Sequence, residues 1–382
     1  MRGVWGIAMM AWLSACSPVT VLNALAPKAG ITETPNIAYA PGDRHALDIY
    51  APAGSGPHPV VVFIYGGGWT DGNKAEYRFV GAALAAKGFL TVVPDYRLFP
   101  EVRFPAFLRD NAAAVAWTKA EIARYGGDPG RIFLMGHSAG AYNVAMLTLD
   151  PQWLEADGVN PDRDIAGTIG LAGPYDFLPL HDPELEDIFA PAGDLRLSQP
   201  IAFARGSAPP MFLAAGTADK TVWPRNTEHL AAAIRADGGV VEERLYDGVN
   251  HTKIIGALSG ALTWLAPSMK DVVGFLDQYD GSRTAARAES PPLMANATSG
   301  VTTDAAPGIK TDAARSLTAY VVPVASTDAA PTVMAGEGPP STPFNTRDQQ
   351  NRRWRPFARQ DGTGTSAPDS LPGAANNTAP SP

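Results

Sequence analysis

The sequence has 382 residues, of which 45% are apolar and 18% are charged, with 38 glycines and 35 prolines. This length allows one large domain or two ordinary ones, and the composition indicates a globular part joined to a low-complexity part. The net charge of -8 argues against nucleic acid as a partner, because phosphate binding needs a surface rich in Lys and Arg. The single cysteine, Cys16, excludes an internal disulfide and a cysteine-based zinc site.

The first fifteen residues have the features of an export signal. Arg2 provides a basic start, and Val4–Leu13 is an apolar run too short to span a bilayer as a helix. Residues 13–16 resemble a bacterial lipobox, in which cleavage precedes the cysteine and the thiol carries lipid. The alternative is a plain secretory signal with an incidental cysteine. We expect an exported protein, lipid-anchored through Cys16 to the periplasmic or cell-surface face of a bacterial membrane, with residues 16–30 as a tether.

From residue 31 onward, apolar strand patterns alternate with helical ones. Ile37–Ala40 and His45–Tyr50 predict an antiparallel hairpin at a sheet edge. The further candidate strands are Val60–Ile64, Leu90–Val93, Ile132–Met135, Thr168–Leu171, Met211–Ala215 and Glu242–Tyr246. The candidate helices are Phe79–Lys87, Phe107–Tyr125, Ala139–Leu149, Asn226–Ala236 and Val272–Gln278. Because the strands are apolar without alternation, we predict an α/β fold with a mostly parallel twisted sheet of about eight strands and helices on both faces.

The pattern ends near Gly281. Residues 282–382 are rich in Ala, Pro, Thr, Ser and Gly and show no period of 2 or 3.6. Such a composition cannot bury enough apolar surface to offset the loss of chain entropy on folding. We therefore predict a folded domain over residues 31–281 and a disordered tail over 282–382.

A nucleophile pattern follows the strand that ends at Met135. Gly136-His137-Ser138-Ala139-Gly140 matches G-x-S-x-G, with a strand before it and a helix after it, as a nucleophile elbow requires. The glycines leave room for strand and helix to pack closely around a strained turn. The start of the helix places free N–H groups near Ser138. The pattern indicates that Ser138 is a catalytic nucleophile rather than part of an incidental turn.

A glycine loop follows the strand Val60–Ile64. In Tyr65-Gly66-Gly67-Gly68-Trp69, three successive glycines expose backbone N–H groups that could hold the anionic oxygen of a tetrahedral intermediate. A phosphate cradle is the alternative, but it would end in Gly-Lys-Ser/Thr, whereas this loop ends in Trp69-Thr70. The loop therefore favours an oxyanion hole.

The two motifs, with Asp95-Tyr96-Arg97-Leu98 between them, resemble the hormone-sensitive-lipase and carboxylesterase branch of the α/β hydrolases. Within that branch, residues 35–280 are most similar to bacterial feruloyl/acetyl-xylan esterases and kynurenine formamidase. The resemblance implies oxyanion donors at Gly67, Gly68 and Ala139. The family usually has His before the glycines, where this chain has Tyr65, expected to hold the loop. Asp95-Tyr96-Arg97 is expected to be a structural turn with a buried ion pair.

The remaining triad members follow from the chain order of this fold, which is Ser, then Asp or Glu, then His. His251 follows the strand Glu242–Tyr246 in a predicted loop, whereas His229 lies in a helical stretch and is expected at the surface. Asp219 follows the strand Met211–Ala215 in Gly-Thr-Ala-Asp, similar to the family pattern, and would orient His251. Asp176, one strand earlier, is the alternative acid.

Pocket and substrate are less defined by the sequence. Trp69, Phe99, Tyr175 and Trp223 lie near strand ends, where pockets form in this fold, and are expected to be part packing and part pocket wall. Few residues precede the sheet, and about 35 lie between Asp176 and Met211, so we expect a small cap or none. An open pocket of this kind favours short-chain acyl esters, or acetyl and feruloyl groups on polysaccharide.

The sequence thus predicts a serine carboxylesterase acting through an acyl-enzyme on a small-molecule ester, without a metal or organic cofactor. One alternative is a formamidase or amidase that uses the same triad. Another is a non-catalytic surface protein that uses the fold for binding, which would predict a broken triad.

Overall fold

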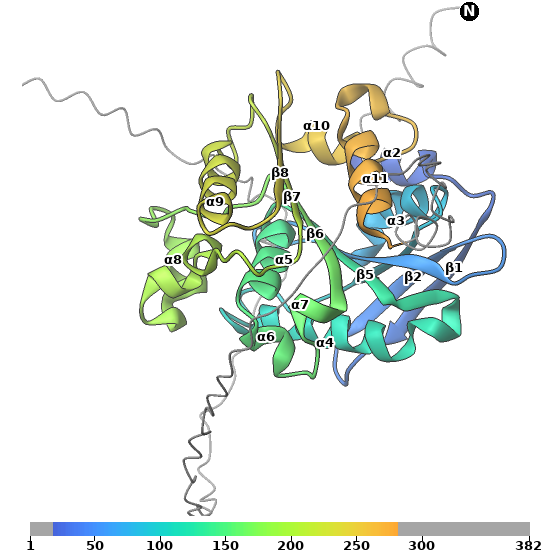
Figure 1. Cartoon of the computed structure of the whole chain (residues 1–382), viewed down its shortest axis with the longest axis horizontal. Coiled ribbons are helices and arrows are strands. Elements are labelled where there is room, and N and C mark those ends of the chain that lie inside the picture. The colour runs from blue at the N-terminus through green and yellow to red at the C-terminus, as the bar shows by residue number, and fades with distance from the viewer. Residues whose placement is uncertain (1–17, 282–382) are drawn as a thin grey trace, which may run out of the picture. The chain divides into compact units, whose positions relative to one another are not determined.

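A computed structural model describes residues 18–281 (Figure 1). The predicted export signal, the predicted lipidation site Cys16 and the predicted tail over 282–382 lie outside the described residues. No helix within 18–281 is both long enough and apolar enough to cross a bilayer.

The described residues form one eight-stranded sheet with the order β1-β2-β4-β3-β5-β6-β7-β8. The strands are β1 (Ile31–Ala38), β2 (Ala46–Pro52), β3 (His58–Ile64), β4 (Leu90–Pro94), β5 (Gly127–His137), β6 (Ile165–Leu171), β7 (Met211–Gly216) and β8 (Val241–Tyr246). β2 is antiparallel to both β1 and β4, and all other neighbours are parallel. The predicted sheet and its edge hairpin are therefore confirmed.

Helices cover both faces of this sheet. They are α2 (Pro18–Leu25), α3 (Arg78–Ala85), α4 (Ala106–Glu121), α5 (Ala139–Leu149), α6 (Gln152–Glu155), α7 (Pro161–Asp164), α8 (Pro183–Phe189), α9 (Arg225–Ala236), α10 (His251–Gly256) and α11 (Ser268–Tyr279). Short 3-10 helices are η1 (Lys74–Tyr77), η2 (Ile122–Tyr125), η3 (Ala190–Ala192), η4 (Leu195–Ser198), η5 (Pro200–Phe203) and η6 (Thr263–Leu265). Figure 1 shows α3 and α11 on one side of the sheet and α5 and α9 on the other.

The core lies between these layers. Every side chain from Val60 to Ile64 in β3 is fully buried. Every residue of α5 is buried as well, with Ala139 and Leu149 at its ends only 1% exposed. A strand covered on both faces has no polar side, which explains the unbroken apolar pattern in the sequence. The centre of the sheet is thus a rigid support for the residues at the ends of β3 and β5.

Part of the expected tether has a different structure. Pro18–Leu25 forms helix α2, which is attached to α3 through Asn23. The side chain of Asn23 accepts a hydrogen bond from the backbone N–H of Phe79 at 3.0 Å and donates one to the carbonyl of Ala75 at 2.8 Å. The first bond gives a partner to an N–H at the start of α3, and the second joins α2 to η1, so α2 is part of the folded unit.

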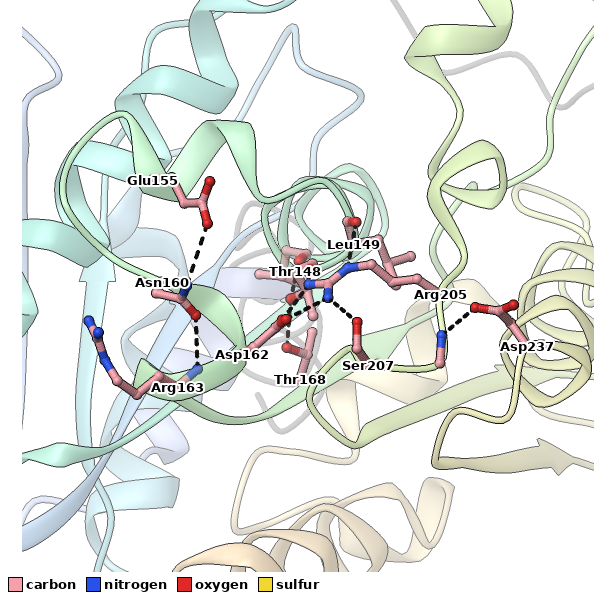
Figure 2. Close-up of polar contacts among 12 residues, drawn as sticks. Thr148, Leu149, Glu155, Asn160, Asp162, Arg163, Thr168, Arg205, Ser207 and Asp237 are labelled. Atoms are coloured by element: carbon pink, nitrogen blue, oxygen red, sulfur yellow. Dashed lines mark hydrogen bonds and ion pairs between the residues drawn. The ribbon is translucent and has the colours of Figure 1, made fainter. Parts of the chain in front are cut away.

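Arg205 links the end of α5 to the segment before β7 (Figure 2). Its guanidinium donates to the carbonyls of Thr148 and Leu149 at 2.8 and 3.0 Å. The same group pairs with both carboxylate oxygens of Asp162 and donates to the hydroxyl of Ser207. A cation at the carboxyl end of a helix complements the helix dipole and satisfies its last carbonyls. Arg205 therefore stabilises the carboxyl end of α5, the helix that follows Ser138.

We predict that Arg205→Leu lowers the free energy of unfolding by about 2–4 kcal/mol, because it leaves two carbonyls and a carboxylate without their charged donor. Arg163→Leu is the matched control in the same region (Figure 2), since Arg163 is 71% exposed and pairs with a neighbouring carboxylate, whereas Arg205 is 19% exposed. The control should change stability by less than about 1 kcal/mol. Urea unfolding measures both, and equal losses would contradict the assigned role.

Candidate active site

Ser138 lies at a sharp turn between β5 and α5. Its backbone angles, φ 56° and ψ -124°, are strained for a residue with a side chain and cost about 1–3 kcal/mol. The turn is possible only because of the flanking glycines. A Cβ on Gly136 would lie 2.3 Å from the backbone of Gly140, and one on Gly140 would lie 2.0 Å from the carbonyl oxygen of Ile64. The local sequence thus requires this elbow, and the side chain of Ser138 does not cap α5.

The glycine loop after β3 passes against this turn. A Cβ on Gly66 would lie 2.9 Å from the Cβ of Ser138 and 2.8 Å from the carbonyl oxygen of His137. Gly67 and Gly68 follow with φ of 117° and 62°, in the region that favours glycine. Ala139 follows Ser138 at the start of α5, where backbone N–H groups have no partner within the helix. The structure therefore places the glycine loop, at Gly66, and the start of α5, at Ala139, beside Ser138.

Tyr65 holds this loop through its hydroxyl group. The hydroxyl donates to Asp95 at 2.9 Å and accepts from Arg44 at 2.8 Å. The same guanidinium donates to the carbonyl of Gly72 at 2.7 Å, beyond the glycines. Burial, together with Tyr96 and Asp95, raises the pKa of Tyr65, so the phenol remains a hydrogen-bond donor. These contacts bear out the expected holding role for Tyr65.

The prediction of a buried ion pair within Asp95-Tyr96-Arg97 is wrong. Arg97 pairs with Asp110 on α4, and the shortest distance between them is 2.6 Å. Asp95 instead accepts from Tyr65 and from the backbone N–H of Lys74. The two side chains belong to different networks because Asp95 faces the glycine loop while Arg97 lies over α4.

Asp219 and His251 form a pair at the ends of β7 and β8. Nδ1 of His251 lies 2.7 Å from Oδ2 of Asp219, whose side chain is fully buried. The other carboxylate oxygen accepts from the backbone N–H groups of Thr221 and Val222 at 2.9 and 3.0 Å. The carboxylate is thereby fixed in one orientation and can set the tautomer of the imidazole.

His251 does not lie in a loop, as the sequence suggested, but is the first residue of α10. Asn250 caps this helix by accepting from the N–H of Lys253 at 2.9 Å. The helix contains only six residues, too few for a clear period in the sequence. The cap gives the backbone of His251 a defined position.

His137 connects this pair to the elbow, and sequence reasoning assigned it no role. Its ring centroid lies 4.7 Å from that of His251, and its Nε2 lies 3.1 Å from the backbone oxygen of His251. Burial and the neighbouring His251 lower the pKa of His137 well below its usual range. The neutral ring can then donate from Nε2 to the carbonyl. In the sequence, the only signal for a role of His137 was its position beside Ser138. In the structure, the contacts of His137 place His251 next to the elbow.

Two kinds of comparison bear on this geometry. Residues 47–234, just under half of the chain, match the BD-FAE family model. Isoprenylcysteine alpha-carbonyl methylesterase ICME of Arabidopsis thaliana is 31% identical over 242 residues, 57% of this chain and 56% of the relative. Esterase LipC of Mycobacterium tuberculosis is 29% identical over 248 residues, 59% of this chain and 60% of the relative. The chain thus spans little more than half the length of the curated relatives it matches.

Solved structures share the fold. A truncated carbohydrate esterase from gut microbiota aligns with a TM-score of 0.57 and 21% identity, over 67% of this chain and 99% of that one. Esterase B from Lactobacillus rhamnosis aligns with a TM-score of 0.61 and 17% identity, over 75% of this chain and 98% of that one. The described residues have an α/β-hydrolase fold. The elbow, the sheet order and the sequence matches agree on this assignment.

The alternative acid has another partner. Asp176, after β6, lies 2.6 Å from Nδ1 of His229 on α9, and both side chains are partly exposed. Asp176 is therefore committed to a different imidazole, while His251 is paired with Asp219. The expected surface position of His229 agrees with its exposure.

The four aromatic residues expected around the pocket divide into two pairs. Trp69 and Tyr175 are buried. Trp69 packs edge-to-face on Tyr142 and donates to the side chain of Asn143 at 3.1 Å, so it is part of the core. Phe99 and Trp223 are half-buried, and each is covered by an arginine guanidinium. Only the second pair is accessible enough to contact a substrate from solution.

The segment between β6 and β7, expected as a small flap, is attached to the rest of the fold. The carboxylate of Asp187 on α8 accepts from Nε and Nη2 of Arg103. The carbonyl of Ile188 accepts from the N–H of Phe104 at 2.9 Å. Phe189 packs edge-to-face on Trp69.

In the described part of the chain, no three His, Cys, Asp or Glu side chains are grouped to hold a metal ion.

Proposed function

We propose that the chain is a serine carboxylesterase. The observation that carries the proposal is the buried Asp219 carboxylate 2.7 Å from His251, whose backbone carbonyl is bonded to the residue preceding Ser138. A hydroxyl on a strained turn, an oriented imidazole and an adjacent glycine loop are the components that acyl transfer needs. Two of the relatives are named as a methylesterase and an esterase, which supports the same reaction class.

The reaction would proceed in two halves. His251 takes the proton of Ser138 as the hydroxyl attacks the ester carbonyl, and the N–H groups of Gly67, Gly68 and Ala139 stabilise the oxyanion. The leaving alcohol receives the proton from His251. Water then attacks the acyl-enzyme by the same route and releases the acid. Asp219 stabilises the imidazolium in both halves.

We further propose that the substrates are short-chain acyl esters, or esters of acetyl or feruloyl groups on polysaccharide. The attached segment with α8 is small, and Trp69 fills space beside the glycine loop, which favours a short acyl group. A long-chain ester that is turned over faster than a butyrate ester would contradict this.

The membrane location is also a proposal and rests on the sequence alone. The apolar run before Cys16 and the small residues at positions 14 and 15 support export and lipid attachment at that thiol. Several acyl chains there would hold the protein at a bacterial membrane, because each buried methylene contributes about 0.8 kcal/mol.

A fluorescent phosphonate tests the chemistry. We expect the probe to label the wild-type chain covalently and to leave Ser138→Ala unlabelled, while the variant keeps its circular dichroism spectrum. Turnover of p-nitrophenyl acetate should fall at least about 10⁴-fold in the variant, because the nucleophile is lost. Labelling of a different serine, or wild-type turnover in Ser138→Ala, would refute the proposal.

A further inference from the structure

Two segments of this acidic protein contain no charged residue. Residues 17–27, which include α2, and residues 254–269, which connect α10 to α11, contain no Asp, Glu, Lys or Arg. They are neighbours in the fold, since a Cβ on Gly260 would lie 3.7 Å from the ring of Pro27. Figure 1 shows the connection between α10 and α11 beside α2. We call the described residues of these two segments, 18–27 and 254–269, the apolar face.

Large apolar side chains on the apolar face point into solvent. Val21 and Leu25 on α2 are 42% and 49% exposed, and Trp264 on η6 is 77% exposed. These are three of the six large apolar side chains that stand out as exposed in the described residues. Single exposed apolar residues are ordinary, but several on neighbouring segments that contain no charged residue indicate an interaction surface.

Exposed lysines adjoin both segments. Lys28 follows the first segment, and Lys253 and Lys270 flank the second. The hydroxyl of Ser268 donates to the carbonyl of Ile254 at 2.9 Å, so the two ends of the second segment meet. The adjacent carboxylate of Asp271 accepts from Tyr246. The margin of the apolar face therefore carries positive charge in a chain whose net charge is -8.

This combination fits a lipid surface. Trp is favoured at the boundary between water and acyl chains, and lysines at the margin attract anionic headgroups. A side chain that is 77% exposed enters a soft, apolar layer without needing a matching groove. The sequence that leads into α2 has no charge from Gly3 to Pro27, so no charged group on it opposes contact with lipid.

We propose that the apolar face docks on a bilayer that contains anionic lipid. The inference rests on the membrane location proposed above, and it adds a defined orientation. The segment that carries Trp264 begins at residue 254, three residues after His251, the proposed base. Docking would therefore hold the active site in a fixed position relative to the bilayer, which lipid attached at Cys16 alone would not do.

The test separates the apolar face from the anchor. The full chain carrying Cys16→Ser cannot be lipidated at residue 16. It is mixed with phosphatidylcholine vesicles that contain about 30% phosphatidylglycerol, an anionic lipid. We expect part of the protein to sediment with these vesicles and less with pure phosphatidylcholine. Leu25→Ser with Trp264→Ser should lower the partition coefficient about tenfold or more, because both side chains lose their apolar contact with lipid.

The matched control replaces two other exposed apolar residues. Leu197 and Val240 are each 52% exposed and lie outside the apolar face, so Leu197→Ser with Val240→Ser should bind vesicles like the parent. Equal binding by the Leu25/Trp264 variant and the parent would overturn the proposal. Light scattering that shows a dimer for the parent and a monomer for the Leu25/Trp264 variant would also overturn it, because the apolar face would then join two copies of the chain.

Turnover of a soluble acetate ester without vesicles distinguishes this inference from the proposed function. All variants should retain the parent's turnover, since neither pair belongs to the catalytic machinery. A parent that binds vesicles through the apolar face but hydrolyses no ester would refute the esterase and leave the docking surface standing.

Discussion

Asp219→Asn is expected to lower kcat by about 10⁴-fold while leaving the fold intact, because an amide cannot hold the imidazole in the required tautomer. Nδ1 of His251 lies 2.7 Å from Oδ2, and the other oxygen is fixed by two backbone N–H groups. If the amide keeps its oxygen toward those N–H groups, its NH₂ faces Nδ1. The proton of the imidazole then moves to Nε2, and the ring can no longer accept the proton of Ser138.

Asp176→Asn is the matched control for this prediction. Asp176 also lies 2.6 Å from an imidazole, but its partner is His229 and both groups are partly exposed. We expect kcat to change less than about threefold, since a surface pair contributes at most about 1 kcal/mol. Steady-state kinetics on p-nitrophenyl acetate compare the two variants. A large loss in Asp176→Asn with a small one in Asp219→Asn would reverse the assignment of the acid.

Gly140→Ala is expected to cost about 3 kcal/mol or more in stability and to abolish most of the activity. The new Cβ would lie 2.0 Å from the carbonyl oxygen of Ile64 and 2.5 Å from that of Tyr65. Both are backbone atoms at the end of a fully buried central strand, so neither can move without shifting the glycine loop. The same displacement would separate the oxyanion donors from Ser138.

Gly274→Ala provides a control with the same substitution in another helix. Gly274 lies in α11, and a Cβ there meets nothing within 4 Å. Alanine should raise the free energy of unfolding by about 0.5–1 kcal/mol, because glycine loses more conformational entropy in a helix. Thermal unfolding and ester turnover measure both variants. Normal stability and turnover in Gly140→Ala would contradict the close packing of strand and helix at the elbow.

Contacts between distant segments were beyond the reach of the sequence. Nothing in the local pattern at Arg97 indicates that its partner is Asp110 on α4 rather than Asp95, two residues away. The same is true of Asn23, whose bonds to Ala75 and Phe79 bring α2 into the folded unit. A side chain's partner depends on which elements pack against each other, and that is decided by the arrangement of the helices around the sheet.

The sequence by itself determined the alternation of strands and helices and the need for an elbow at Ser138, since unbroken apolar runs require burial on both faces and only glycines fit beside that turn. It also indicated which histidine and aspartate follow the last two strands. Only the tertiary structure decided that Asp219 pairs with His251 while Asp176 pairs with His229, and that Trp69 is buried while Trp264 is exposed. Distances between strand ends and the burial of a single ring arise from packing across the whole sheet, which no local pattern records.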